Sequence, residues 1–184
     1  GGASWCSPTS TSMALAFWGR GPSEADLAGI GPQVPDRAVV HAARRVFDHG
    51  FDGAGNWSFN TAYAAGYGVE AFVTRLRSLE EAELFVGAGI PLVASVSFRS
   101  EELEGAGYDT SGHLLTVAWF DTAGDVVCSD PASHELPSND EVRVVYDRKQ
   151  LEKAWLDGSG GLVYVIRPPE VPLPPVPVPA EPNW

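Results

Sequence analysis

Apolar and polar residues alternate with a helical period in the first half of the chain and with a strand period in the second half. Apolar positions predict a helix over residues 7–18, with Pro8 in its first turn and Gly19 after its end. Ser23, Asp36 and Asp147 are predicted N-caps, and a capping box is expected at residues 78–81. The further helices are expected at residues 23–29, 37–49, 60–65, 78–89 and 148–156.

Strand patterns dominate later in the chain. Alternating or continuous apolar runs predict strands at residues 69–76, 90–98, 113–120, 125–131, 141–147 and 161–167. Because helices come first and strands later, we expect an α+β fold in which the opening helix is central and packs on an antiparallel sheet.

A change of composition after residue 167 divides the chain into a domain, residues 1–167, and a proline-rich tail, residues 168–184. Recurring prolines favour polyproline II over helix or sheet, so the tail is expected to be a linker or spacer. Trp184 supports a different interpretation, a docked arm, and a third is that the tail occupies a cleft of its own or a neighbouring molecule.

The length, composition and net charge of the chain exclude several classes of protein. With 184 residues, 44% of them hydrophobic, the chain can bury one sizeable core. Its net charge of −12 argues against binding to nucleic acid or to anionic membranes, and no apolar run is long enough to insert into a membrane. Zinc, P-loop and dinucleotide motifs are absent, so no metal and no cofactor are expected. The chain opens at Gly1 without a methionine, and we expect it to be part of a longer one.

Cys6 stands where the first predicted helix begins. A helix N-terminus favours a thiolate, and its free N–H groups suit a developing oxyanion, so the position suits a nucleophile. The alternative is a buried thiol that serves as a small hydrophobic residue. Cys128 lies mid-strand and is expected to be a core thiol, although a disulfide between the two cysteines is a rival interpretation.

Among the four histidines, His113 is the candidate general base. It follows Gly112 at the mouth of a strand, where a glycine lets another backbone approach closely. The other three lie on a helix or in a polar loop and are expected to be solvated: His41, His49 and His134.

A hairpin brings a carboxylate towards His113. If the turn lies at residues 121–124, paired residue numbers sum to about 245, so Leu115 opposes Asp130 and His113 is its diagonal neighbour on the same face. An aspartate in that place can hold a histidine in one tautomer. The structural alternative is that Asp130, which precedes Pro131, only opens a turn.

Several segments together resemble a known family. They are GGASWCSPTSTSMALAFWG, DGAGNWSFNTAYAAGYGVEAFVTRL, GIPLVASVSF, SGHLLTVAWF and SDPAS, followed by YDRKQLEKAWLDGSGGLVYVI. They resemble the secreted, mostly actinobacterial cysteine peptidases related to the bacteriocin-leader peptidases, which have a papain-like fold. The resemblance implies Cys6 as nucleophile, His113 as base and acid, and Asp130 as orienting group.

One departure concerns the second oxyanion donor. Enzymes of this fold usually supply it from a glutamine upstream of the cysteine, and the chain starts too close to Cys6 to contain one. Asn56 and Asn60 are candidates for that role or for lining the cleft, with loop and cap hydrogen bonding as the alternative. Trp5 and Trp57 are expected to form walls of a substrate cleft, with core packing as the alternative, and Gly112 is expected to take part in substrate binding.

These observations predict a cysteine peptidase that forms an acyl-enzyme with a peptide or protein substrate. The resemblance also implies secretion. Two alternatives remain: an amidase that cuts peptidoglycan cross-links with the same triad, and a degenerate domain that binds peptide without cleaving it.

Overall fold

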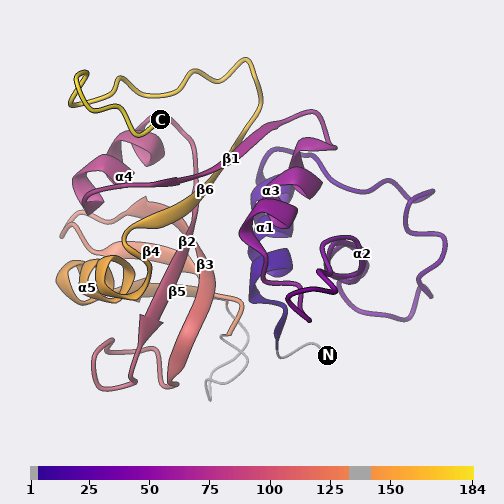
Figure 1. Ribbon diagram of the computed structural model, residues 1–184. Helices are drawn as coiled ribbons and strands as arrows, with labels where there is room; N and C mark the ends of the chain where they lie inside the picture. Colours follow the sequence, from indigo (N-terminus) through magenta and orange to yellow (C-terminus); the bar gives the residue numbers. More distant parts are fainter. Residues whose placement is uncertain (1–3, 133–141) are drawn as a thin grey trace.

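One antiparallel sheet forms the centre of the molecule (Figure 1). The computed structural model describes residues 4–132 and 142–184. In the described residues, six strands pair in the order β1-β6-β2-β3-β4-β5, and every neighbouring pair is antiparallel. The strands are β1 (Glu70–Arg75), β2 (Leu92–Phe98), β3 (Thr110–Phe120), β4 (Val126–Ser129), β5 (Arg143–Tyr146) and β6 (Leu162–Arg167).

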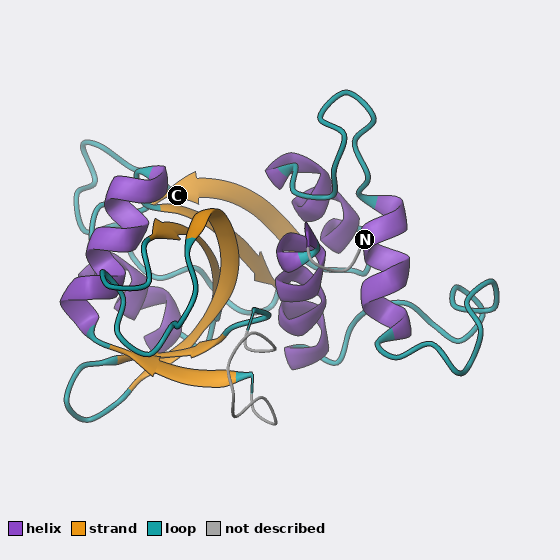
Figure 2. Ribbon diagram, turned by 90° about the horizontal axis from the view of Figure 1, so that it is seen from below, coloured by secondary structure: helices purple, strands orange, loops and turns teal. Residues whose placement is uncertain are grey.

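Helices cover both faces of the sheet (Figure 2). One face carries α1 (Cys6–Phe17) and α3 (Trp57–Ala65), with α2 (Arg37–Arg45) outside them, and the other carries α4 (Leu79–Gly87) and α5 (Arg148–Ser159). Successive side chains of β2 and β3 point to opposite faces of the sheet and so belong to two apolar clusters. Val93 and Leu114 face α1, whereas Leu92 and Leu115 face α4 and α5. The α+β architecture with a helix packed on an antiparallel sheet is confirmed.

The buried face of α1 is more polar than the sequence predicts. Ser7, Ser10 and Thr11 are fully buried beside Ala14 and Leu15, a spacing of three and four residues that marks one helix face. The hydroxyl of Ser10 donates to the carbonyl oxygen of Leu114 in β3 at 2.9 Å. Hydrogen bonds as well as apolar packing therefore hold α1 against the sheet.

Some predicted helix boundaries are wrong. Residues 23–29 form turns in which the Ser23 hydroxyl donates to Asp26 at 2.7 Å, α2 ends at Arg45, and α3 begins at Trp57. The predicted capping box is also wrong, because Ser78 makes no side-chain cap and the carboxylate of Glu81 accepts hydrogen bonds from Arg77. The competing ion pair with Arg77 explains this difference.

The proline-rich tail packs on the body of the protein, unlike the expected spacer. In Figure 1 it runs back beside α4. Trp184 packs edge-on against Phe85 of α4 with ring centroids 4.8 Å apart, and its indole N–H donates to the carbonyl oxygen of Pro174 at 2.8 Å. Asn183 donates to the backbone oxygen of Arg75 at the end of β1, also at 2.8 Å. The tail thus packs against α4 and the end of the edge strand β1.

Candidate active site

Cys6 is the first residue of α1, with Trp5 at the N-cap position. The backbone N–H and the hydroxyl of Thr9 both donate to the carbonyl oxygen of Trp5, at 3.0 and 2.7 Å. Pro8 lies in the first turn, where its missing N–H removes no helical hydrogen bond. The thiol is therefore partly exposed at the positive end of a well-formed helix.

The hairpin of β3 and β4 brings His113 to Asp130. Its register pairs Thr116 with Ser129, as the sequence predicts, and shifts by one residue only farther along, between Val117 and Trp119. The imidazole Nε2 lies 2.7 Å from Oδ1 of Asp130. The other ring nitrogen, Nδ1, remains available to Cys6.

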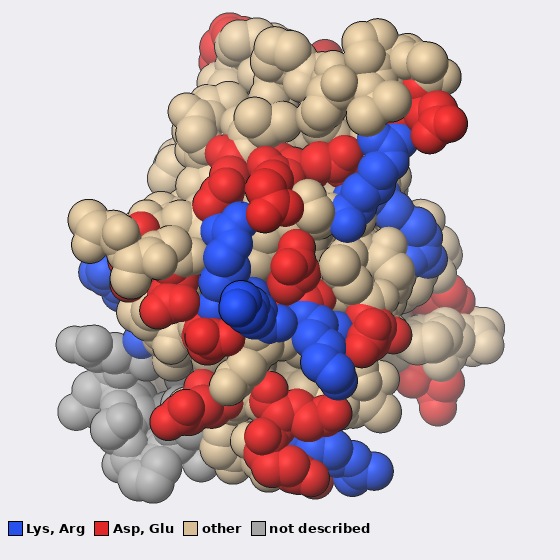
Figure 3. Space-filling view, turned by 90° about the vertical axis from the view of Figure 1, so that its left-hand side faces the viewer, with Lys and Arg blue, Asp and Glu red and all other residues tan. Residues whose placement is uncertain are grey.

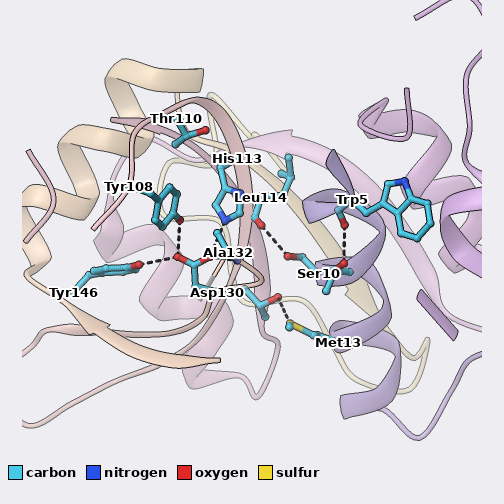
Figure 4. A network of polar contacts seen from close by, with 12 residues as sticks. Trp5, Ser10, Met13, Tyr108, Thr110, His113, Leu114, Asp130, Ala132 and Tyr146 are labelled. Carbon is cyan, nitrogen blue, oxygen red and sulfur yellow. Dashed lines mark hydrogen bonds and ion pairs between the residues drawn. The ribbon is translucent and has the colours of Figure 1, made fainter. Parts of the chain in front are cut away.

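Two tyrosines that the sequence analysis missed complete the surroundings of Asp130 (Figure 4). The hydroxyls of Tyr108 and Tyr146 both donate to Oδ2 at 2.7 Å, and the N–H of Ala132 donates to Oδ1 at 2.8 Å. The carboxylate is 1% exposed and accepts four hydrogen bonds from the described residues, counting that of His113. The sequence contains one indication of this role for Tyr146. A tyrosine that points inward from a valine-rich strand requires a hydrogen-bond partner for its hydroxyl.

Cys6, His113 and Asp130 each shift the pKa of a neighbour in the direction that favours its charged form. Burial opposes ionisation of Asp130, but hydrogen bonds and the charge of His113 outweigh it and hold its pKa below the usual value. Burial likewise opposes charge on His113, yet hydrogen bonds to Asp130 and Cys6 raise its pKa to about 9. Burial would raise the pKa of Cys6, but His113 and the backbone of Leu114 and Ser7 lower it. Both shifts, a raised pKa of His113 and a lowered pKa of Cys6, favour a thiolate beside an imidazolium.

A cleft with a volume of about 1120 Å³ opens over this pair. Four of the residues expected to bind substrate line it: Trp5, Asn56, Trp57 and Gly112. The amide of Asn56 caps α3 by accepting from Phe59 at 3.2 Å and donates to Asp48 at 2.7 Å. Asn56 therefore lines the cleft with its amide already engaged.

Asn60 does not line the cleft. It is fully buried, and its amide donates to the carbonyl oxygens of Ala54 and Asn56 at 2.9 and 2.8 Å. Both amide hydrogens are used, so it has no donor left for an oxyanion, and the loop-and-cap alternative describes it. The position expected for an upstream donor falls outside the described residues.

Cys128, His41 and His49 do not line the cleft around Cys6 and His113. Both cysteines are free thiols, so the rival disulfide is absent, and Cys128 is completely buried in the core, as expected. His41 is buried, contrary to the prediction, with Nδ1 3.0 Å from the hydroxyl of Tyr63. His49 is exposed, and His134 lies outside the described residues.

Within residues 4–132 and 142–184, no group of three or more His, Cys, Asp or Glu side chains could hold a metal ion. No helix in the same residues is both long and apolar enough to cross a membrane.

One family model matches this chain, and solved structures share its fold. A model described as Peptidase_C39 like family matches residues 2–161. A double glycine motif protease from an AMS/PCAT transporter, solved in complex with the leader peptide, has a TM-score of 0.52 at 15% identity, covering 89% of this chain and 84% of that one. A protein described as a C39-like peptidase from Bacillus anthracis has a TM-score of 0.53 at 17% identity, covering 89% of each chain. No curated protein matches. The solved structures support the fold.

Proposed function

Because this chain belongs to the Peptidase C39-like family, we propose that it hydrolyses peptide bonds with Cys6 as nucleophile, His113 as acid and base, and Asp130 as orienting group. The observation that carries the proposal is the position of His113. One ring nitrogen is bonded to a buried carboxylate at 2.7 Å, and the ring also interacts with the thiol of Cys6. This is the order of groups that an activated thiol requires.

The first half of the reaction uses the ion pair. The Cys6 thiolate attacks the carbonyl carbon of the scissile amide, and the negative charge moves to the carbonyl oxygen. N–H groups at the start of α1, which have no helical acceptors, stabilise that oxygen. The His113 imidazolium then protonates the leaving amine, which departs and leaves a thioester on Cys6.

The second half returns the enzyme to its starting state. Neutral His113 takes a proton from water, and the hydroxide formed attacks the thioester. The acid product leaves, and the thiolate and imidazolium are restored. Asp130 keeps the ring oriented throughout and stays ionised, since four donors surround it.

A peptide is the proposed substrate. One solved structure of the same fold contains a leader peptide, and Cys6 here lines an open cleft of about 1120 Å³. Peptidoglycan amidase activity would use the same groups, but no observation favours it. Secretion stays a prediction from the sequence.

The test is a digestion of a peptide mixture prepared from a denatured bacterial proteome. Mass spectrometry should find new cleavage products with the parent protein and none with Cys6→Ala or His113→Ala, provided that all three proteins unfold at similar temperatures. A parent protein that leaves the mixture intact while iodoacetamide still labels Cys6 would favour the peptide-binding alternative. Cleavage that persists in Cys6→Ala would refute the mechanism.

A further inference from the structure

Arg75 is a basic residue that lines the active-site cleft. Its side chain lines the same cavity as Cys6 and His113, and it is the one Lys or Arg among the described lining residues. The acidic lining residues are Asp52 and Asp109. The cleft therefore has a cation at one identifiable place.

The sheet register fixes where this cation lies. Arg75 of β1 pairs with Leu162 of β6, and Ser95 of β2 pairs with Leu114 of β3, next to His113. The β2–β6 register, continued by one residue, places Ser95 beside Leu162. These four residues form a row across the sheet.

The row faces the same side of the sheet as the nucleophile. Leu162, Leu114 and Val73 belong to the apolar cluster against which Cys6 packs. Arg75 follows Val73 by two residues in β1, so strand alternation directs it to that side as well. Arg75 and Cys6 are thus on one face.

The distance along the row corresponds to a short stretch of peptide. Three interstrand spacings separate Arg75 from Leu114, or about 14 Å. An extended peptide advances roughly 3.3–3.6 Å per residue. A substrate that follows the cleft from Cys6 therefore reaches Arg75 after about four residues.

The structure holds Arg75 in place and leaves its charge unpaired. Its guanidinium donates to the carbonyl oxygen of Ser159 at the end of α5, and a Cβ at Gly160 would come within 2.8 Å of it. In the described part of the chain, no carboxylate lies within ion-pair distance of Arg75. On the face of α4 and α5, by contrast, blue and red side chains intermingle (Figure 3), and Arg148 and Lys153 are each paired with a glutamate.

We propose that Arg75 forms a subsite for a carboxylate of the peptide substrate, about four residues from the scissile bond. The carboxylate is that of an Asp or Glu side chain or of the peptide's own C-terminus. This inference rests on the proposed peptidase function and adds a specificity to it. The guanidinium has donors left after the contact with Ser159, and it offers them in the fork geometry that a carboxylate accepts.

The test uses the same proteome-derived peptide mixture. A side-chain carboxylate predicts enrichment of Asp and Glu about four residues from the cut, on one side only. A terminal carboxylate predicts cuts about four residues from the C-terminus, which are lost when the peptide carboxyl groups are amidated. For a matched peptide pair that differs only by Glu or Gln at that position, kcat/KM should differ about tenfold, the lower range for a charge-assisted hydrogen bond at an exposed site.

Variants of Arg75 separate this inference from the proposed function. Arg75→Ala should abolish the preference and still cleave neutral peptides, Arg75→Lys should keep part of it, and Arg75→Glu should favour Lys at the same position. Lys149→Ala, which removes an exposed charge from α5, should leave the preference unchanged. Cleavage without a carboxylate preference, or a preference that survives in Arg75→Ala, overturns the subsite alone. A parent that cleaves nothing overturns the peptidase function and the subsite with it.

Discussion

Replacing Asp130 with asparagine removes the charge that holds His113 and leaves the size of the side chain almost unchanged. The pKa of His113 is about 9 in the structure, against a usual value near 6.5. That difference corresponds to about 3 kcal/mol of preference for the imidazolium, at about 1.4 kcal/mol for each pKa unit. This figure is a net of opposing causes, because burial lowers the pKa of His113 whereas Asp130 and Cys6 raise it.

Asp130→Asn should therefore disrupt the ion pair at neutral pH. Without the carboxylate, burial dominates and lowers the pKa of His113, so the ring becomes neutral and the pKa of Cys6 rises. In the parent the ion pair forms as pH rises through the lowered pKa of Cys6 and is lost as pH rises through about 9. In the variant the thiolate should form only at higher pH, and a loss of about 3 kcal/mol corresponds to a fall of about 100-fold in its population below the raised pKa of Cys6.

The assay is the rate of Cys6 alkylation by iodoacetamide between pH 4 and 10, followed by mass spectrometry. Cys128 is completely buried and should not react in the folded protein. The matched control is Asp109→Asn, which removes a carboxylate from the same cleft without touching His113. If folded Asp130→Asn has the pH profile of the parent, the assignment of Asp130 as orienting group is wrong.

Two further predictions concern stability. Tyr146→Phe removes a buried hydrogen bond to the Asp130 carboxylate and should lower the free energy of unfolding, measured by urea titration, by about 1.5–3 kcal/mol. Tyr63→Phe, at a residue whose hydroxyl has no charged acceptor in the described part of the chain, should cause a smaller loss. Equal losses would contradict the special role of a charged acceptor. Trp184→Ala should lower it by about 2 kcal/mol, because the ring packs on Phe85 while remaining partly exposed, and should leave the alkylation rate unchanged. No change in stability would show that the tail does not dock in solution.

Local sequence patterns predicted most of the helices and strands that position the candidate site. Pro8 and Gly19 mark the two ends of the helix that begins at Cys6. Proline restricts the backbone to a conformation that suits the first turn of a helix, and glycine gives it the freedom to leave the helix. The turn at residues 121–124 sets the register of β3 on β4, and hence the approach of His113 to Asp130. These features depend on residues close in sequence, or on strand pairing that one short turn determines.

The errors arise where one local signal competes with another group. Ser78 and Glu81 have the spacing of a capping box, but Arg77 provides a cationic partner for the glutamate. Asn60 has a polar amide that could line a cleft. In the structure, the carbonyl oxygens of Ala54 and Asn56 accept both of its amide hydrogens. Spacing alone does not show which of two available hydrogen bonds forms.

The sequence by itself determined the α+β class, the helix that presents Cys6, and the hairpin that joins His113 to Asp130. Only the tertiary structure decided which hydroxyls surround the Asp130 carboxylate, where the tail lies, and that Arg75 shares the cleft with Cys6. The reason is physical: helix and strand periods record which face of one element is buried, and they carry no information about which distant element covers that face. Contacts such as that of Ser7 with Tyr164, across most of the chain, arise only when the layers pack.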